Sequence, residues 1–444
     1  MTSINLADRA VDLGEWAANT PDADEVFARA VRAWLDENLA GEFAHLRGRG
    51  GPGSEHEFFA DRLAWDRHLA KAGWTCLGWP SQHGGRGATM NQRIIFHQEY
   101  ARANAPARVN HLGEELLGPT LIEFGTPEQQ ERFLPGIVNV TELWAQGYSE
   151  PGAGSDLAGV ATTARLDGAP ADGPARGAPG AQWTINGQKI WTSLAHVAQW
   201  VFVLARSEPG SQRHAGLSFL LVPLEQPGIE VRPIQQLTGT SEFNEVFFDD
   251  AKTDADLIVG KPGEGWAVAM GLLQFERGVS TLGQQVGFAR ELDDLVEIAQ
   301  RNGAADNPEI AGALKRARIE LAVMRAHAGR TLDAALGDNT ASRTTHGFAT
   351  AAGDASVAKL LWANWHRRLG ELAMQVIGAP SLVGPATTTE GVPNDLTDPE
   401  HVELDEWQRL FLFTRADTIY GGSNEVQRNI IAERVLGLPR EARA

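Results

Sequence analysis

A short segment near the end of the chain combines residue types that could hold an oxygen-bearing ligand. Residues 420–425 read Tyr-Gly-Gly-Ser-Asn-Glu and lead into an amphipathic run. The two glycines allow a sharp turn, and the helix start that follows leaves unpaired N–H groups that can bind anionic or carbonyl oxygens. An ordinary glycine turn with a Ser or Asn cap would explain the same residues equally well.

Two further segments could approach a flat, phosphate-bearing ligand. Residues 148–156 read Tyr-Ser-Glu-Pro-Gly-Ala-Gly-Ser-Asp, in which hydroxyls and glycines would let backbone N–H groups come close to a pyrophosphate or to the edge of a heterocycle. Residues 187–193 read Gly-Gln-Lys-Ile-Trp-Thr-Ser, in which an indole could stack on a flat ring beside a hydroxyl donor. Each segment alone could also be a simple turn.

Composition excludes several classes of partner. The net charge of -18 argues against non-specific binding to nucleic acid or to an anionic membrane surface. The single cysteine, Cys76, excludes an intramolecular disulfide and a cysteine-based metal cluster, which is consistent with the cytoplasm. No apolar run is long enough to cross a bilayer, and residues 1–19 lack the features of a signal peptide. No pair of histidines has metal-binding spacing, so we predict no metal site.

The hydrophobic period changes twice along the chain. It is helical from about residue 21 to 144, and it is helical again beyond Asp254. We therefore predict an α+β multidomain fold with an N-terminal helical domain (residues 1–143), a middle domain that is an antiparallel sheet or barrel (144–253) and a C-terminal four-helix bundle (254–444). We expect residues 167–181 to form an exposed, mobile excursion and 380–399 to form a non-helical insertion. The predicted strands are residues 161–166, 183–185, 200–204, 217–222, 229–233 and 245–248.

Taken together, the three segments closely resemble the motifs of the flavin-dependent acyl-CoA dehydrogenases, in the same order, over about residues 21–439. The resemblance implies the same three-domain architecture, with a β-barrel as the middle domain, together with bound FAD and an acyl-CoA substrate. It also implies a homodimer or homotetramer formed through the bundle, with an electron-transfer flavoprotein as electron acceptor. In this family a glutamate removes the α-proton of the thioester while the β-hydrogen leaves as hydride to flavin N5, which gives a trans-2-enoyl-CoA.

The resemblance also implies which residues hold the ligands. Trp191 would cover the flavin ring, and Ser193, where relatives often have Thr, would bond the ring near N5. Gln375 and Gly378 match a segment that contacts the FAD of a neighbouring subunit, although Ala379 replaces a second glycine there. The other implied cofactor contacts are Tyr148, Ser149, Gly154, Ser155, Thr192, Ser423 and Glu425. The implied substrate contacts are Ser155, Arg277 and Gly422.

The position of the catalytic base departs from the commoner family pattern. In many relatives the catalytic Glu directly follows the Tyr of the C-terminal motif, and here that position is Gly421. A second arrangement, similar to isovaleryl-CoA and long-chain acyl-CoA dehydrogenases, places the Glu just before an Arg, as in Glu276-Arg277. We therefore predict Glu276 as the base, because an apolar site would raise its pKa, and Gly421 as a backbone N–H donor to the thioester carbonyl. A surface ion pair is the alternative, but adjacent helix residues do not face each other.

One further departure leaves other functions open. Relatives usually carry Arg-x-x-Phe-Gly early in the bundle, whereas residues 300–305 read Gln-Arg-Asn-Gly-Ala-Ala. Similar departures occur in bacterial dehydrogenases of bulky acyl-CoAs, some of which are heteromers. The chain could therefore be a non-catalytic or half-site subunit of a heteromer, or a flavin oxidase or monooxygenase of the same fold. The length, branching and ring content of the acyl group stay open.

Overall fold

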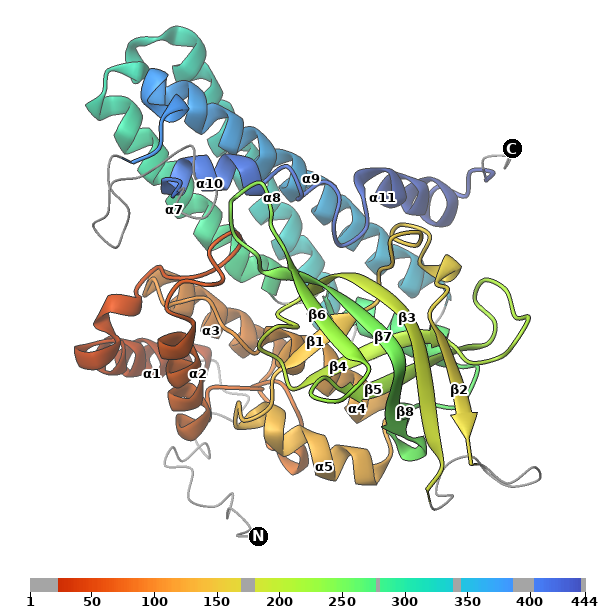
Figure 1. Cartoon of the computed structure of the whole chain (residues 1–444). Helices are drawn as coiled ribbons and strands as arrows, with labels where there is room; N and C mark the ends of the chain where they lie inside the picture. Colours follow the sequence, from red (N-terminus) through yellow and green to blue (C-terminus); the bar gives the residue numbers. More distant parts are fainter. Residues whose placement is uncertain (1–22, 169–179, 277–279, 338–344, 386–402, 441–444) are drawn as a thin grey trace. The chain divides into compact units, whose positions relative to one another are not determined.

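The computed structural model describes residues 23–168, 180–276, 280–337, 345–385 and 403–440 (Figure 1). These residues form two compact units. Residues 1–235 with 241–278 belong to the first unit, and residues 236–240 with 279–444 belong to the second. The predicted three-domain boundaries therefore stay a prediction.

The first unit begins with helices whose apolar stripes predicted them. Phe27, Val31 and Leu35 recur every four residues in the first helix, and all three are buried. Thr126 and Gln129 form a capping box that starts a later helix at Pro127. The helices are α1 (Ala23–Asn38), α2 (Phe59–Ala72), α3 (Met90–Arg102), α4 (Gly118–Phe124), α5 (Pro127–Val138) and α6 (Gly265–Glu276).

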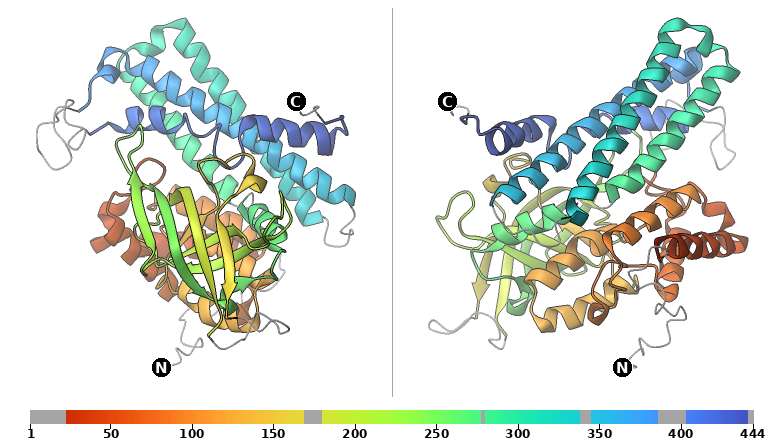
Figure 2. Two further views of the ribbon diagram at one scale, coloured as in Figure 1. Left: turned by 45° about the vertical axis from the view of Figure 1, so that its right-hand side comes forward. Right: turned by 180° about the vertical axis from the view of Figure 1, so that it is seen from behind.

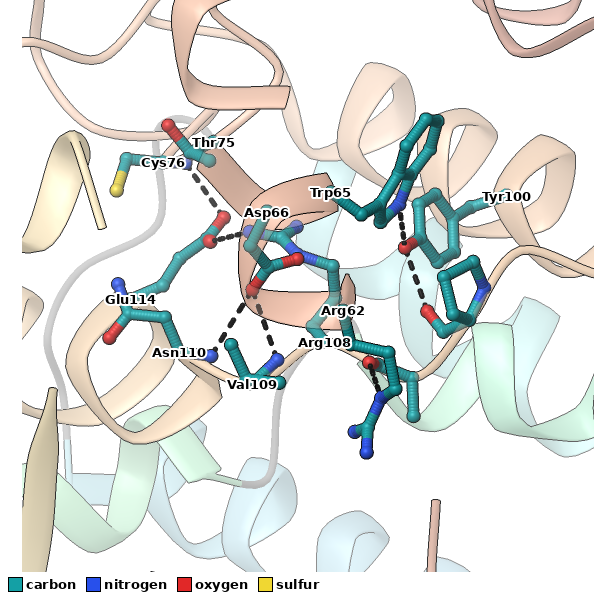
Figure 3. Close-up of polar contacts among 12 residues, drawn as sticks. Arg62, Trp65, Asp66, Thr75, Cys76, Tyr100, Arg108, Val109, Asn110 and Glu114 are labelled. Atoms are coloured by element: carbon teal, nitrogen blue, oxygen red, sulfur yellow. Dashed lines mark hydrogen bonds and ion pairs between the residues drawn. The ribbon is translucent and has the colours of Figure 1, made fainter. Parts of the chain in front are cut away.

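A buried polar network holds the N-terminal helices together (Figure 3). The fully buried Asp66 carboxylate accepts hydrogen bonds from Arg108 Nε at 2.6 Å and from the backbone N–H groups of Val109 at 3.0 Å and Asn110 at 3.3 Å. Arg108 also donates to Glu114 at 2.7 Å, and Glu114 accepts from the Cys76 N–H at 2.7 Å. A buried carboxylate is tolerated only with such partners. The network therefore fixes the start of a π-helical turn (Leu112–Leu117) that packs against α6 and the first strand.

The remainder of the first unit is an eight-stranded sheet in the order β6-β7-β3-β2-β4-β5-β8, with β1 paired to β4. The pairs are antiparallel except β1 with β4 and one residue pair of β2 with β4, which run parallel. Phe202 and Leu204 face one hydrophobic cluster while Val201 and Val203 face another, as alternation along a strand requires. The strands are β1 (Trp144–Gly147), β2 (Thr163–Asp167), β3 (Gln182–Ser193), β4 (Trp200–Arg206), β5 (Leu217–Pro223), β6 (Ile229–Ile234), β7 (Phe243–Asp254) and β8 (Ile258–Val259).

The predicted α+β class is confirmed, but several details of the sheet were not predicted. All six predicted strands are present, whereas the short strands β1 and β8 were missed. The strands β3 and β7 each span 12 residues. Their pairing contains two register shifts, and β-bulges at these points let the two strands stay paired on both sides of each shift. Of the excursion predicted at residues 167–181, positions 169–179 lie outside the described part of the chain.

The second unit is helical, as predicted, and its long helices α7, α8 and α9 pack on one another (Figure 2). Leu321 and Met324 of α8 meet Trp365 and Leu369 of α9 in the core. At the start of the non-helical insertion predicted at residues 380–399, the structure instead has a short 3-10 helix (Ala379–Leu382), and positions 386–399 of the insertion lie outside the described part. The helices are α7 (Ser280–Arg301), α8 (Pro308–Gly337), α9 (Thr345–Ile377), α10 (Glu406–Phe413) and α11 (Asn424–Ile430). Within the ranges that the structure describes, no helix is both long and apolar enough to span a membrane.

Candidate active site

Two of the three predicted ligand segments lie side by side in the first unit. The loop after β1 meets the end of β3, where the Ile190 N–H donates to the Ser149 carbonyl at 2.9 Å. The Tyr148 ring is buried and packs edge-on against Phe202 and Phe219, with centroids 5.9 and 6.2 Å away. The loop backbone is therefore anchored to the sheet through residues that precede the exposed Gly154 and Ser155.

A buried ion pair, which no sequence motif predicted, anchors the same loop. The fully buried Lys189 Nζ donates to Glu150 at 2.7 Å, to the Leu204 carbonyl at 2.7 Å and to the Tyr148 carbonyl at 3.1 Å. Glu150 also accepts from the N–H groups of Ala161 at 2.6 Å and Thr162 at 2.9 Å. The available signal was a lysine directly before the apolar Ile190 and Trp191 in the segment of residues 187–193.

The pKa values of Lys189 and Glu150 show that each group stabilises the charge of the other. Burial lowers the pKa of Lys189 to about 8, although the Glu150 carboxylate acts in the opposite direction. Burial alone would raise the pKa of Glu150, but the Lys189 charge and the Ala161 hydrogen bond outweigh it and lower that pKa. Both groups are therefore charged near neutral pH, and each depends on the other.

The end of β3 carries a strained tryptophan. The register between β3 and β7 shifts between Lys189 and Thr192, so one extra residue bulges out of the strand. Trp191 in this bulge has φ of 61°, in the left-handed region that a bulky residue rarely adopts. Its side chain is 55% exposed, beside Phe243 at a centroid distance of 6.2 Å. Such strain concentrates at functional sites, and here it turns an indole face outward.

Unused hydrogen-bonding capacity lies directly beside this tryptophan. Thr192 and Asn244 are fully buried, and in the described part of the chain neither the Thr192 hydroxyl nor the Asn244 amide oxygen has a hydrogen-bond partner. A buried polar atom without a partner costs free energy unless a ligand supplies one. An exposed indole next to unsatisfied polar atoms fits a flat heterocycle that has donors and acceptors, such as the flavin that the motifs imply.

Replacing Thr192 by Val is expected to stabilise the ligand-free protein by about 1 kcal/mol, because it removes an unsatisfied buried hydroxyl. The same change is expected to weaken FAD binding about 10-fold, which corresponds to one lost hydrogen bond. Thermal unfolding and FAD titration would measure the two effects. Thr184→Val is the matched control, because the buried Thr184 hydroxyl, unlike that of Thr192, donates a hydrogen bond to Asp167 at 2.5 Å. Removing that bond should destabilise the protein. Destabilisation by Thr192→Val would contradict the interpretation.

The third segment lies in the second unit and forms a glycine turn. Gly421 has φ of 62° and Gly422 has φ of 85°, so both adopt the left-handed region. Gln427 Nε2 donates to both of their carbonyls, at 3.2 and 3.1 Å, and Ser423 caps α11. Among the described residues, no acceptor meets the N–H groups of Gly421 and Gly422. The turn therefore offers two backbone donors, as an oxygen-binding site requires.

A buried histidine lies between two acidic groups in the same unit. His366 of α9 is within 2.7 Å of Asp417 through Nδ1 and within 3.1 Å of Glu291 of α7 through Nε2. Burial would lower the pKa of His366, but the Glu291 charge and the Asp417 hydrogen bond raise it to about 10. His366 is therefore a cation at neutral pH.

The stability of the bundle is expected to fall as the pH rises from about 6.5 to about 10. Below pH 6.5 His366 is protonated in both the folded and the unfolded chain. Between pH 6.5 and 10 it is protonated only in the folded chain, so each rise in pH within this window favours unfolding. We expect the His366 contribution that is lost to be roughly 5 kcal/mol, since each pKa unit corresponds to about 1.4 kcal/mol. Denaturant unfolding of the wild type and of His366→Gln across this range would measure it. A difference between the two proteins that does not change with pH would contradict the assignment.

The remaining predicted residues are placed as follows. Glu276 is the last residue of α6, and its side chain lies outside the described part of the chain, as does all of Arg277. Ser193 is half-buried at the end of β3, while Gln375 and Gly378 are exposed at the end of α9. Glu425 is exposed and pairs with Arg428 at 3.3 Å. The segments around Ser149 and Trp191 belong to the first unit, and those around Gln375 and Gly421 belong to the second.

Comparison with known proteins covers almost the whole chain. The family models described as acyl-CoA dehydrogenase N-terminal, middle and C-terminal domains match residues 21–141, 145–251 and 263–436. Acyl-CoA dehydrogenase IpdE1 of Mycobacterium tuberculosis is 63% identical over 419 residues, which are 94% of this chain and 99% of that protein.

Two solved structures share the fold. The Tcur3481-Tcur3483 steroid ACAD has a TM-score of 0.75 and 26% identity, and the match covers 97% of this chain and 100% of that one. The ChsE4-ChsE5 complex from Mycobacterium tuberculosis has a TM-score of 0.70 and 26% identity, and the match covers 96% of this chain and 100% of that one.

Proposed function

Because the chain belongs to the acyl-CoA dehydrogenase family and is an oxidoreductase, we propose that it dehydrogenates an acyl-CoA thioester to a trans-2-enoyl-CoA with FAD as cofactor. The observation that carries the FAD assignment is the strained, exposed Trp191 beside the unsatisfied Thr192 hydroxyl. FAD, when bound, supplies the acceptor for the hydride that leaves the β-carbon. The protein supplies binding, orientation and proton transfer.

In this proposal the first unit holds the cofactor through the strand end and the anchored loop. Trp191 stacks on the flavin, and Thr192 and Ser193 bond its polar edge. The backbone around Tyr148 and Ser149 borders the ring, and the exposed Gly154 and Ser155 lie against phosphate or thioester. Neither Gly152 nor Gly154 has an atom within 4 Å of the position that a Cβ would occupy, which leaves room for a ligand at the backbone. The family motifs also assign cofactor contacts to Ser423 and Glu425, and assign Gln375 and Gly378 to the FAD of a neighbouring subunit.

Glu276 is proposed to take the α-proton on a carboxylate oxygen. The C-terminal motif has Gly421 where many relatives carry the base, so no side chain there can do so. The N–H groups of Gly421 and Gly422, whose carbonyls are already bonded to Gln427, donate to the thioester carbonyl as negative charge develops on its oxygen. Arg277 is proposed to contact the substrate.

The acyl group is proposed to be bulky and ring-containing, because a structural neighbour at 26% identity is named a steroid ACAD. That neighbour and the ChsE4-ChsE5 structure are each named as a pair of chains, so we propose that this chain assembles with copies of itself or with a second chain of the same fold. The altered segment at residues 300–305 favours the heteromer. We also propose that the chain acts in the cytoplasm and passes electrons to an electron-transfer flavoprotein.

Anaerobic titration of the purified protein with short, branched, aromatic and steroid-like acyl-CoAs tests the proposal. The yellow flavin is expected to bleach with a ring-containing thioester and to bleach poorly with short chains. A chain that carries FAD only after addition of a second chain would instead be a half-site subunit. Peroxide production that matches substrate loss, with no reduction of a dye acceptor, would indicate a flavin oxidase.

A further inference from the structure

A chain of polar groups, whose central members His366 and Asp417 are buried, leads to the residue that precedes the glycine turn. Glu291 of α7 bonds His366 of α9 at 3.1 Å, and His366 bonds one oxygen of Asp417 at 2.7 Å. The other Asp417 oxygen accepts from the Tyr420 hydroxyl at 2.8 Å. Tyr420 is followed directly by Gly421, so the chain ends at the turn.

Asp417 is held on three sides, which leaves it little freedom. Its side chain is 1% exposed, each carboxylate oxygen has a donor, and its backbone carbonyl accepts from Lys359 Nζ at 2.6 Å. The Lys359 ammonium also lies 4.4 Å from the centre of the Tyr420 ring. A carboxylate bonded in this way restrains the hydroxyl end of Tyr420, a residue that is 40% exposed.

A fixed neighbour matters here because two successive glycines in the left-handed region are otherwise free to adopt many conformations. Gln427 restrains the turn from its C-terminal side through both carbonyls. Tyr420 is the side-chain restraint on its N-terminal side. The stability of the bundle alone does not explain why these polar groups pack between its helices. Apolar side chains of similar volume would hold the same helices together without the free-energy cost of removing charged groups from water.

We propose that Glu291, His366, Asp417 and Tyr420 form a positioning relay that holds the N–H groups of the Gly421–Gly422 turn in one direction for the reacting thioester. This inference rests on the proposed function. None of the four side chains is a catalytic residue. They act through the turn, whose donors stabilise developing charge only if they are already oriented.

The first test is hydrogen–deuterium exchange of a peptide covering residues 416–427, in the full chain without substrate. Tyr420→Phe removes only the hydroxyl, and His366→Gln removes the charged bond to Asp417. Each is expected to speed exchange of the turn amides about 5-fold or more, and the double variant is expected to match the faster single variant, because groups in one relay are not additive. Leu321→Ala, a buried core change in α8, controls for general destabilisation and should leave the turn unchanged.

The second test is the rate of flavin bleaching by a saturating acyl-CoA. We expect both single variants to lower it about 10- to 100-fold with little change in KM, because the lost orientation affects the transition state more than binding. Three outcomes would each overturn the relay. The two substitutions could act independently, so that their effects multiply in the double variant; the exchange of the turn amides could be unchanged; or the amides could exchange faster while the bleaching rate stays the same. If no acyl-CoA bleaches the wild-type protein, the proposed function fails. A double variant whose amides exchange no faster than those of the faster single variant would then still support the relay, but only as a restraint on the glycine turn.

Discussion

Glu276→Gln is expected to bind FAD and acyl-CoA like the wild type and to bleach the flavin about 10²–10⁴-fold more slowly, the range that general-base catalysis supplies. Glutamine matches the size and hydrogen-bonding reach of glutamate but cannot accept the α-proton. The loss should therefore fall on the bleaching rate at saturating substrate and leave the dissociation constant of the thioester unchanged. Stopped-flow absorbance and equilibrium titration would measure the two quantities.

Two further variants make this prediction specific. Glu264→Gln is the same substitution one residue before α6, where Glu264 is exposed and pairs only loosely with Lys261 at 3.8 Å, and it should leave bleaching unchanged. Gly421→Glu in the Glu276→Gln background places a carboxylate where many relatives carry it. Partial recovery is expected, reduced by the roughly 1–2 kcal/mol that a side chain costs at a positive φ. Full activity of Glu276→Gln would refute the base assignment.

Lys189→Met is expected to lower the free energy of unfolding of the first unit by about 3–5 kcal/mol, because it leaves the Glu150 carboxylate buried without its cation. The loop from Tyr148 to Asp156 should then detach from β3, and FAD binding should be lost with it. Denaturant unfolding and flavin content after purification would show both effects.

The matched controls separate charge from packing. Lys261→Met makes the same change on a side chain that is 80% exposed, and it should alter stability by less than about 0.5 kcal/mol. The double variant Glu150→Gln with Lys189→Met removes both charges and should recover part of the loss. If the double variant were as unstable as Lys189→Met alone, lost packing and not the unpaired carboxylate would be the cause.

The helices and the longer strands were predictable because their patterns are local. Phe27, Val31 and Leu35 repeat at the helical period, and the largely apolar run from Leu217 to Val222 is long enough to indicate a strand. β1 and β8 were missed because strands of four and two residues are too short to display a period. The Trp191 bulge depends on the register of β7, which a local pattern cannot reveal.

The candidate site was predictable only where a motif marked it. The motifs named Trp191, Thr192 and the Gly421–Gly422 turn, but they gave no sign of which polar atoms would be left without partners. The ion pair of Lys189 with Glu150 joins residues 39 positions apart, and the contact of His366 with Asp417 joins residues 51 positions apart. Such pairings arise from tertiary packing, so sequence spacing does not indicate them.

The buried network of Asp66, Arg108 and Glu114 has a consequence for how the polypeptide is made. Asp66 meets its partners 42 to 44 residues further along the chain, so during synthesis α2 is complete long before its buried carboxylate can be neutralised. A nascent or truncated chain that ends before Arg108 would have to bury an isolated charge or leave α2 undocked. Fragments ending near residue 104 should therefore be cleaved faster within α2 than fragments that extend past Asn110, as limited proteolysis would measure.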